Sequence, residues 1–139
     1  MDKLFDLTFF TNDEDYEEGF HIGLFTTQEE AESVAERYLK EVPGFKDYDC
    51  IPRVFAFPVI GGTEQIKQVY RVLGWNTNEN LDETDILISS CFADRNEAEK
   101  ALLLAKESTP REEWVLNCHT IGQCDWAEGF VRTSAEEET

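Results

Sequence analysis

Two stretches of the sequence share one pattern of a helix start, an apolar stripe and a proline stop, offset by 67 residues. The first runs from Phe25 to Pro43 and the second from Phe92 to Pro110. Between these ends, further positions coincide without a gap: Glu30 with Glu97, Ala31 with Ala98, and Glu32 with Glu99. Such a match indicates an internal duplication. We therefore expect two similar units, each built around one helix.

Both stretches carry the signals of an amphipathic helix. A capping box is indicated by Thr27 with Glu30 and again by Asp94 with Glu97. In this motif the two side chains accept hydrogen bonds from backbone N–H groups that are otherwise free at the start of a helix. Pro43 then prevents the helix from continuing, as does Pro110 in the second stretch, because proline lacks the N–H group. Apolar residues fall three and four positions apart, which predicts one buried face. They are Ala31, Val34, Ala35, Tyr38, Leu39 and Val42 in the first helix, and Ala98, Ala101, Leu102 and Ala105 in the second, where Leu103 and Leu104 are expected to broaden the face.

Apolar and β-branched runs on both sides of these helices predict strands. They are Leu4–Phe10, Phe20–Phe25 and Ile51–Ile60 in the first half, and Gln68–Trp75, Ile86–Phe92 and Glu113–Ile121 in the second. Each half is thus strand, strand, helix, strand, and a right-handed crossover predicts the local strand order 2-1-3. We expect an α+β fold with a mostly antiparallel sheet and both helices packed on one side. One extended sheet and two facing sheets remain alternatives.

The predicted repeats are residues 1–62 and 63–133, sharing one core in a single domain, with Gly61 and Gly62 at the junction. Within the second repeat, Gln123–Thr133 is expected to add an edge strand or an arm. Residues 134–139 form an acidic tail that we expect to fray. Pro52 and Pro58 cannot donate to a β-ladder, which predicts an exposed edge or a break in the strand that contains them.

The net charge of −18, from 30 acidic and 12 basic residues, narrows the range of partners. It disfavours direct binding to nucleic acid and to anionic membranes, because both carry the same sign of charge. It favours a basic protein partner, since complementary fields accelerate encounter. The alternative is that the acidity only keeps the protein soluble.

Catalytic, metal and cofactor sites have no support in the sequence. His21 and His119 both fall in predicted strands, and the neighbouring Cys118 would point to the opposite face from His119. The stretch that begins at Asp13 does not match the pattern of a calcium-binding EF-hand loop, because Glu18 and Leu24 stand where that pattern needs glycine and glutamate. No glycine-rich phosphate loop occurs. We therefore expect no catalytic residue, no bound metal and no cofactor.

The four cysteines, Cys50, Cys91, Cys118 and Cys124, are too scattered for a disulfide scaffold or a zinc site. We expect reduced thiols that pack in strands. No stretch reaches the roughly 20 apolar residues of a membrane helix. The first residues lack the order of a signal peptide. A cytoplasmic location is therefore expected.

Two acidic stretches join equivalent pairs of predicted strands and are the candidate partner-binding site. Tyr16 lies within the first, and aromatic residues among charges are typical of interface anchors. The alternative is two solvated hairpin tips. The candidate residues are Asp13, Glu14, Asp15, Tyr16, Glu17 and Glu18 in the first stretch, and Glu79, Asp82, Glu83 and Asp85 in the second.

The stretch from Cys124 to Phe130 contains the pattern Trp126-x-Glu128-Gly129-Phe130. It resembles the W-x-E-G-F ending of many small, uncharacterised bacterial proteins, and the helix start at Phe25–Ala31 is similar to theirs too. Such proteins are often found among toxin-immunity and phage-related genes. The resemblance implies a bacterial or phage origin and brings no catalytic residue with it.

These observations lead to a functional hypothesis of a non-enzymatic, acidic protein that inhibits or neutralises a basic, nuclease-like or toxin-like partner. A toxin-immunity protein and a nucleic-acid-mimicking inhibitor of the anti-restriction or anti-CRISPR type both fit it. The first alternative is a structural or housekeeping domain that forms a homodimer through an exposed sheet edge. The second is an enzyme of unrecognised type with a pocket around His21 or His119.

Overall fold

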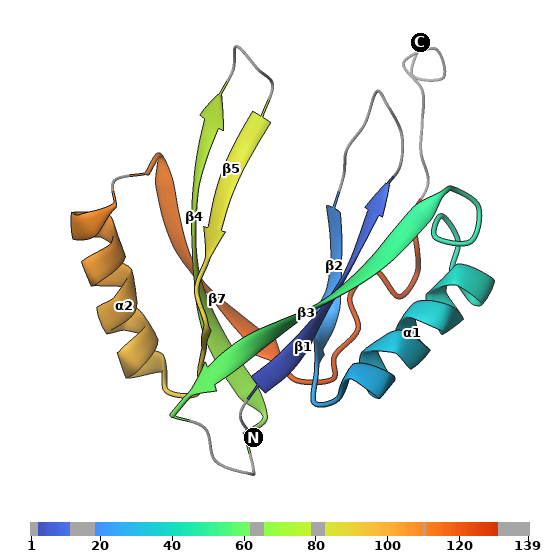
Figure 1. Cartoon of the computed structure of the whole chain (residues 1–139), viewed down its shortest axis with the longest axis horizontal. Helices are drawn as coiled ribbons and strands as arrows, with labels where there is room; N and C mark the ends of the chain where they lie inside the picture. The colour runs from blue at the N-terminus through green and yellow to red at the C-terminus, as the bar shows by residue number, and fades with distance from the viewer. Residues whose placement is uncertain (1–2, 12–18, 62–65, 79–82, 110, 131–139) are drawn as a thin grey trace. The chain divides into compact units, whose positions relative to one another are not determined.

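The structure, a computed structural model, describes residues 3–11, 19–61, 66–78, 83–109 and 111–130 (Figure 1). The chain divides into two units. We call residues 5–56 with 122–139 the α1 unit, and residues 1–4 with 57–121 the α2 unit. Each takes its name from the helix that it contains.

β1 (Lys3–Thr11), which belongs to the α1 unit from Phe5 onward, pairs antiparallel with β2 (Gly19–Phe25), from Phe5 opposite Phe25 to Phe10 opposite Gly19. The register shifts once, between Leu7 and Thr8. On the other side of β1 lies β3 (Cys50–Ile60), which gives the order β2-β1-β3. The first half thus has the predicted order 2-1-3, with β3 running opposite to β1 (Figure 1).

Helix α1 (Gln28–Glu41) follows β2 and begins and ends as the sequence predicts. The Thr27 side chain accepts a hydrogen bond of 3.1 Å from the backbone N–H of Glu30. The Glu30 carboxylate in turn accepts from the Thr26 hydroxyl at 3.2 Å. Ala31, Ala35 and Tyr38 are the buried face, and Pro43 comes directly after the C-cap Val42. Apolar periodicity and capping therefore locate this helix correctly.

The core of the α1 unit is largely aromatic. The ring of Phe45 lies 4.9 Å from that of Phe9, 5.2 Å from that of Tyr38 and 5.6 Å from that of Phe20, between centroids. Tilted and edge-on contacts of this kind suit the charge distribution of aromatic rings. The buried cluster consists of Leu7, Phe9, Phe20, Ile22, Phe25, Ala31, Ala35, Tyr38, Val42, Phe45 and Cys50.

Residues 122–130 complete this core from the far end of the chain. The N–H of Gly122 donates to the carbonyl of Leu24 at 2.8 Å, and that of Asp125 donates to Ile22 at 2.7 Å. The Phe130 ring stacks on Phe20, with centroids 4.5 Å apart. The described part of the expected arm contains turns and no strand. Phe130, the last residue of the W-x-E-G-F pattern, therefore has a structural role in the α1 unit.

The α2 unit is centred on β4 (Gln68–Asn78). On one side it pairs antiparallel with β7 (Glu113–Thr120), and on the other with β5 (Glu83–Ile88) and β6 (Cys91–Phe92). The sequence predicts one strand where β5 and β6 lie. It is interrupted because Ser89 turns its hydroxyl to accept from the N–H of Val72 at 2.8 Å. The end of β3 pairs in parallel with β6, Val59 opposite Cys91.

Helix α2 (Arg95–Ser108) contacts β4, β6 and β7 of the same unit. Its cap differs from the predicted one, because Asp94 accepts from the N–H of Asn96 at 2.9 Å rather than from that of Glu97. Ala98 is buried, but the expectation that Leu103 and Leu104 broaden this face is wrong, because they are 61% and 63% exposed. The buried face of α2 is therefore narrower than that of α1.

In the residues that the structure describes, these elements confirm an α+β fold with two helices and mostly antiparallel strands. That both helices lie on one side and that residues 1–62 and 63–133 form the repeats stay predictions. Residues 122–130 fall in the predicted second repeat, yet they contact residues of the first. Within the described part of the chain, neither helix is long and apolar enough to cross a membrane.

Candidate functional site

Most of the predicted acidic loop residues, Asp13–Glu18, Glu79 and Asp82, lie outside the described residues. The strands that they join are antiparallel partners, β1 with β2 and β4 with β5, as a hairpin connection requires. Glu83 and Asp85 belong to β5 itself, where they lie opposite Asn78 and Asn76. A role for these residues in partner binding stays a prediction.

The negative charge is concentrated in the α1 unit. Its residues include 18 acidic and 5 basic side chains, a net charge of −13. The α2 unit has 12 acidic and 7 basic side chains, a net charge of −5. Most of the field that would steer a basic partner therefore originates from one unit.

The two helices show the same asymmetry. Helix α1 carries two basic residues, of which Lys40 forms an exposed ion pair with Glu36 at 2.9 Å. Hydrogen bonding and the charge of Lys40 hold the pKa of Glu36 below its usual value. The acidic side chains of α1 are Glu29, Glu30, Glu32, Glu36 and Glu41. Its surface is therefore strongly acidic.

Helix α2 has equal numbers of acidic and basic side chains. Arg95 pairs with Glu99 at 3.1 Å, and Lys100 pairs with Glu97 at 3.4 Å. Exposed ion pairs of this kind contribute little to stability, but they cancel the local field. The two helices share a sequence pattern, yet α1 is acidic and α2 is electrostatically balanced.

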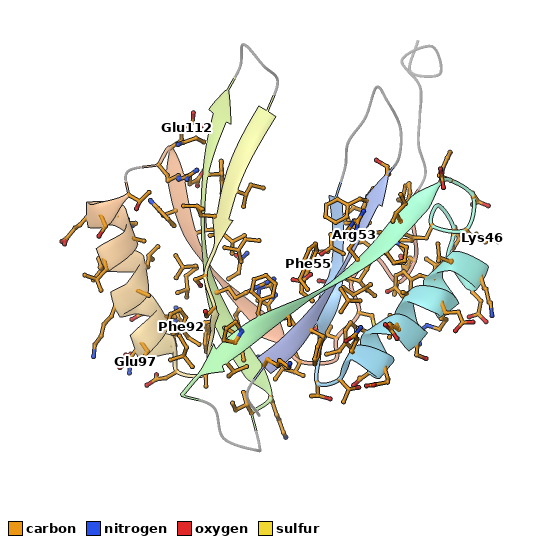
Figure 2. All side chains as sticks on the ribbon, in the orientation of Figure 1. Lys46, Arg53, Phe55, Phe92, Glu97 and Glu112 are labelled. Carbon is orange, nitrogen blue, oxygen red and sulfur yellow. The ribbon has the colours of Figure 1, made fainter. Side chains whose placement is uncertain are left out.

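A groove with a volume of about 570 Å³ lies between α1 and β3 in the α1 unit. Ala35 and Leu39 give the helix side an apolar floor, and Glu32 and Glu36 add carboxylates. Phe55 is 42% exposed and meets the ring of Phe10 edge-on at 6.4 Å. Figure 2 shows Arg53 and Phe55 on the middle of β3. The complete lining is Gln28, Glu32, Ala35, Glu36, Leu39, Pro52, Arg53, Val54 and Phe55.

His21 belongs to a hydrogen-bonded group on β1 and β2. Its Nε2 atom lies 3.0 Å from Oδ2 of Asp6, a carboxylate that is only 4% exposed. The Thr8 hydroxyl donates to Oδ1 of the same carboxylate at 2.7 Å. In a nucleophilic triad the hydroxyl would face the imidazole instead. This geometry ties the two strands together around a buried acid.

His119 has a comparable setting in the α2 unit. The Nε of Arg71 donates to its Nε2 at 3.3 Å, and the guanidinium lies 5.0 Å from the centre of the Phe57 ring. Arg71 is 3% exposed, so its charge is held beside an aromatic face and an imidazole. Both histidines thus contact buried charged residues, which favours a structural role for each.

The cysteines are free thiols: Cys50 and Cys91 are buried, Cys118 is exposed and Cys124 is partly exposed. Three of them lie in strands, whereas Cys124 lies in the segment that follows β7. Among the described residues, no group of three histidine, cysteine or acidic side chains could hold a metal ion.

Sequence reasoning missed two features, the groove and the packing of residues 122–130. Pro52 and Pro58, which predict an exposed edge or a break in β3, were the available signal for the groove. Comparison of the chain with protein-family models, with curated proteins and with solved structures found no match.

Proposed function

We propose that this protein is a non-enzymatic, acidic binding protein that inhibits or neutralises a basic partner protein. The observation that carries the proposal is the net charge of −13 on the α1 unit, the unit that also contains the groove beside α1. A charge of this size raises the encounter rate with a basic surface and repels anionic ligands. The partner class is a nuclease-like or toxin-like protein, whose phosphate-binding cleft would accept a surface rich in carboxylates.

Two further observations support a binding role. Most carboxylates of α1 have no basic neighbour on the helix, so their field is available to a partner. His21 contacts Asp6 and His119 accepts from Arg71, and these buried partners support a structural role for both imidazoles within this proposal. We also propose that the protein is cytoplasmic. The two ββαβ halves are proposed to descend from one duplicated module.

The test begins with capture of partners on the immobilised protein at low salt and elution with rising salt. The recovered candidate is then purified, and inhibition of its own activity is measured. We expect the captured partner to be a basic protein whose activity falls when an equimolar amount of the acidic protein is added. A variant with Glu29, Glu30, Glu32 and Glu36 changed to glutamine should inhibit less. The matched control, Glu97→Gln with Glu99→Gln on the balanced helix, should inhibit as the parent does.

One observation favours a second candidate function, a structural domain that forms a homodimer. Ile86, Leu87 and Ile88 of β5 are 53%, 41% and 44% exposed, and β5 ends the strand order of the described sheet. An exposed apolar edge strand is a template for pairing with a second chain. The molecular mass in solution separates the two candidates.

A further inference from the structure

The groove beside α1 runs along the edge of β3 rather than over a face of the sheet. Four consecutive residues of the strand, Pro52 to Phe55, line it. Successive side chains of a strand point to opposite faces, so a groove over one face would meet only every second residue. Contact with all four therefore points to an open space that follows the backbone edge.

The hydrogen-bonding direction of β3 identifies the groups at this edge. The strand lies between β1 and β6, and Ile60 accepts from the N–H of Ala93 on the β6 side at 3.0 Å. Alternate residues of a strand direct N–H and C=O groups to the same edge. Val54 and Ala56 therefore direct theirs to the side on which Ile60 does.

Pairing on that edge, within the described residues, covers Val59 and Ile60 and leaves the earlier part of β3 without a strand partner. Pro52 and Pro58 alternate with Val54 and Ala56 along the strand and therefore face the same edge. The absence of an N–H group in each proline removes no ladder hydrogen bond there. The edge beside the groove thus offers the N–H and C=O groups of Val54 and Ala56 to an incoming chain.

The helix wall of the groove determines which side chains an added strand would need. Gln28, Glu32, Glu36 and Leu39 lie along one side of α1, with Ala35 between them. Arg53 of β3 adds one cation to the lining, and Glu36 is already paired with Lys40, so the acidic surplus at the groove comes from Glu32 and from the net charge of −13 on the α1 unit. This surplus and the apolar floor favour lysine or arginine, whose methylene stems pack while the charged head pairs. On the other face, Phe55 offers an apolar surface.

We propose that the groove between α1 and β3 binds an extended segment of the basic partner, which adds as a strand to the β3 edge at Val54 and Ala56. Basic side chains at alternate positions of the segment face Glu32 and Glu36. Main-chain hydrogen bonds supply affinity and alternate side chains supply specificity, as in other cases of strand addition. The inference rests on the proposed function, for which it names the binding surface.

The probe is a short capped peptide that alternates lysine and valine, titrated into the full chain at low salt and followed by two-dimensional amide NMR. We expect shifts at the amides of Val54 and Ala56 and along the groove side of α1. A peptide of the same sequence, N-methylated at every second residue, should bind about tenfold more weakly, because it cannot complete the ladder. This comparison needs no variant of the protein.

Protein variants complete the test. Glu32→Gln with Glu36→Gln should weaken binding about fivefold at low salt, since each charge contributes modestly at an exposed site. Glu97→Gln with Glu99→Gln should not change it. Binding with shifts away from the groove and equal affinity for the N-methylated peptide would overturn this inference but leave the proposed function standing. Absence of any salt-dependent binding to basic peptides, together with no inhibited basic partner, would overturn both.

Discussion

The hydroxyl of Tyr38 in α1 donates a hydrogen bond of 2.8 Å to the backbone carbonyl of Asp125, 87 residues further along the chain. Tyr38 is fully buried, and Arg37 beside it lies 3.7 Å from the Cys124 sulfur. The segment after β7 is thus fixed to the helix of the first half. The stability of the α1 unit therefore depends on this attachment.

The first prediction concerns alkaline pH. Burial, followed by the nearby thiol of Cys124, raises the pKa of Tyr38 to about 12 from its ordinary value of 10.0. The unfolded chain therefore loses the Tyr38 proton at a lower pH than the folded protein does. The contribution of this hydroxyl to stability is present below pH about 10 and is lost as the pH rises to about 12. Tyr38→Phe should remove this pH dependence. Urea unfolding of both proteins across that range measures it, and equal slopes would contradict the assignment.

The second prediction uses glycines with positive φ. Gly129 has φ 84° and an added methyl group would collide with the Pro43 carbonyl, while Gly44 has φ 87° and faces the Phe130 ring. Alanine at either position should lower the free energy of unfolding by about 3 kcal/mol, from backbone strain and collision together.

Gly61 and Gly122 are the matched controls, because their φ values are 75° and 84° and nothing lies within 4 Å of an added methyl group. Alanine there should cost about 1 kcal/mol, the backbone term alone. Chemical denaturation measures all four variants. An equal loss of unfolding free energy at all four positions would show that the close contacts at Gly44 and Gly129 do not affect stability.

The third prediction concerns Phe130, whose ring stacks on Phe20 and on Tyr48, with centroids 4.5 Å and 5.8 Å apart. Phe130→Ala should destabilise the α1 unit by about 3 kcal/mol, since it removes a large ring from an aromatic cluster. Leu104→Ala, at a side chain that is 63% exposed on α2, is the control and should cost less than about 0.5 kcal/mol. Thermal unfolding distinguishes them.

Much of the fold follows from local rules that the sequence displays. Thr27 and Pro43 delimit α1, and the stripe through Ala31, Ala35 and Tyr38 identifies its buried face. The strand order within each half follows from the handedness of the crossover. These features depend on neighbouring residues and on short connections, which is why the sequence suffices for them.

The remainder depends on contacts between distant residues. Nothing near Trp126 or Phe130 indicates that their rings pack against Phe20, because the sequence signal of a loop is the same wherever it docks. The split between β5 and β6 depends on the Ser89 hydroxyl meeting Val72 on another strand. Of the candidate site, the acidity of α1 can be read from composition, whereas the groove exists only once β3 lies beside that helix.

The fourth prediction concerns the oligomeric state. If the protein acts by binding a basic partner, light scattering after size exclusion should give the monomer mass of 16.0 kDa across a range of concentrations. Ile86→Lys on β5 should leave that mass unchanged. A dimer mass that reverts to the monomer in Ile86→Lys would favour the homodimer through the β5 edge instead.

The most direct test of the central claim is the association rate with the captured basic partner, measured at increasing salt concentration. We predict that the rate falls steeply with salt, because screening shortens the reach of the charges on the α1 unit. Neutralising Asp13, Glu14, Asp15, Glu17 and Glu18 together should lower the low-salt rate about tenfold, with a smaller effect on dissociation. An association rate that is independent of salt, and unchanged in that variant and in the α1 glutamine variant, would contradict the account.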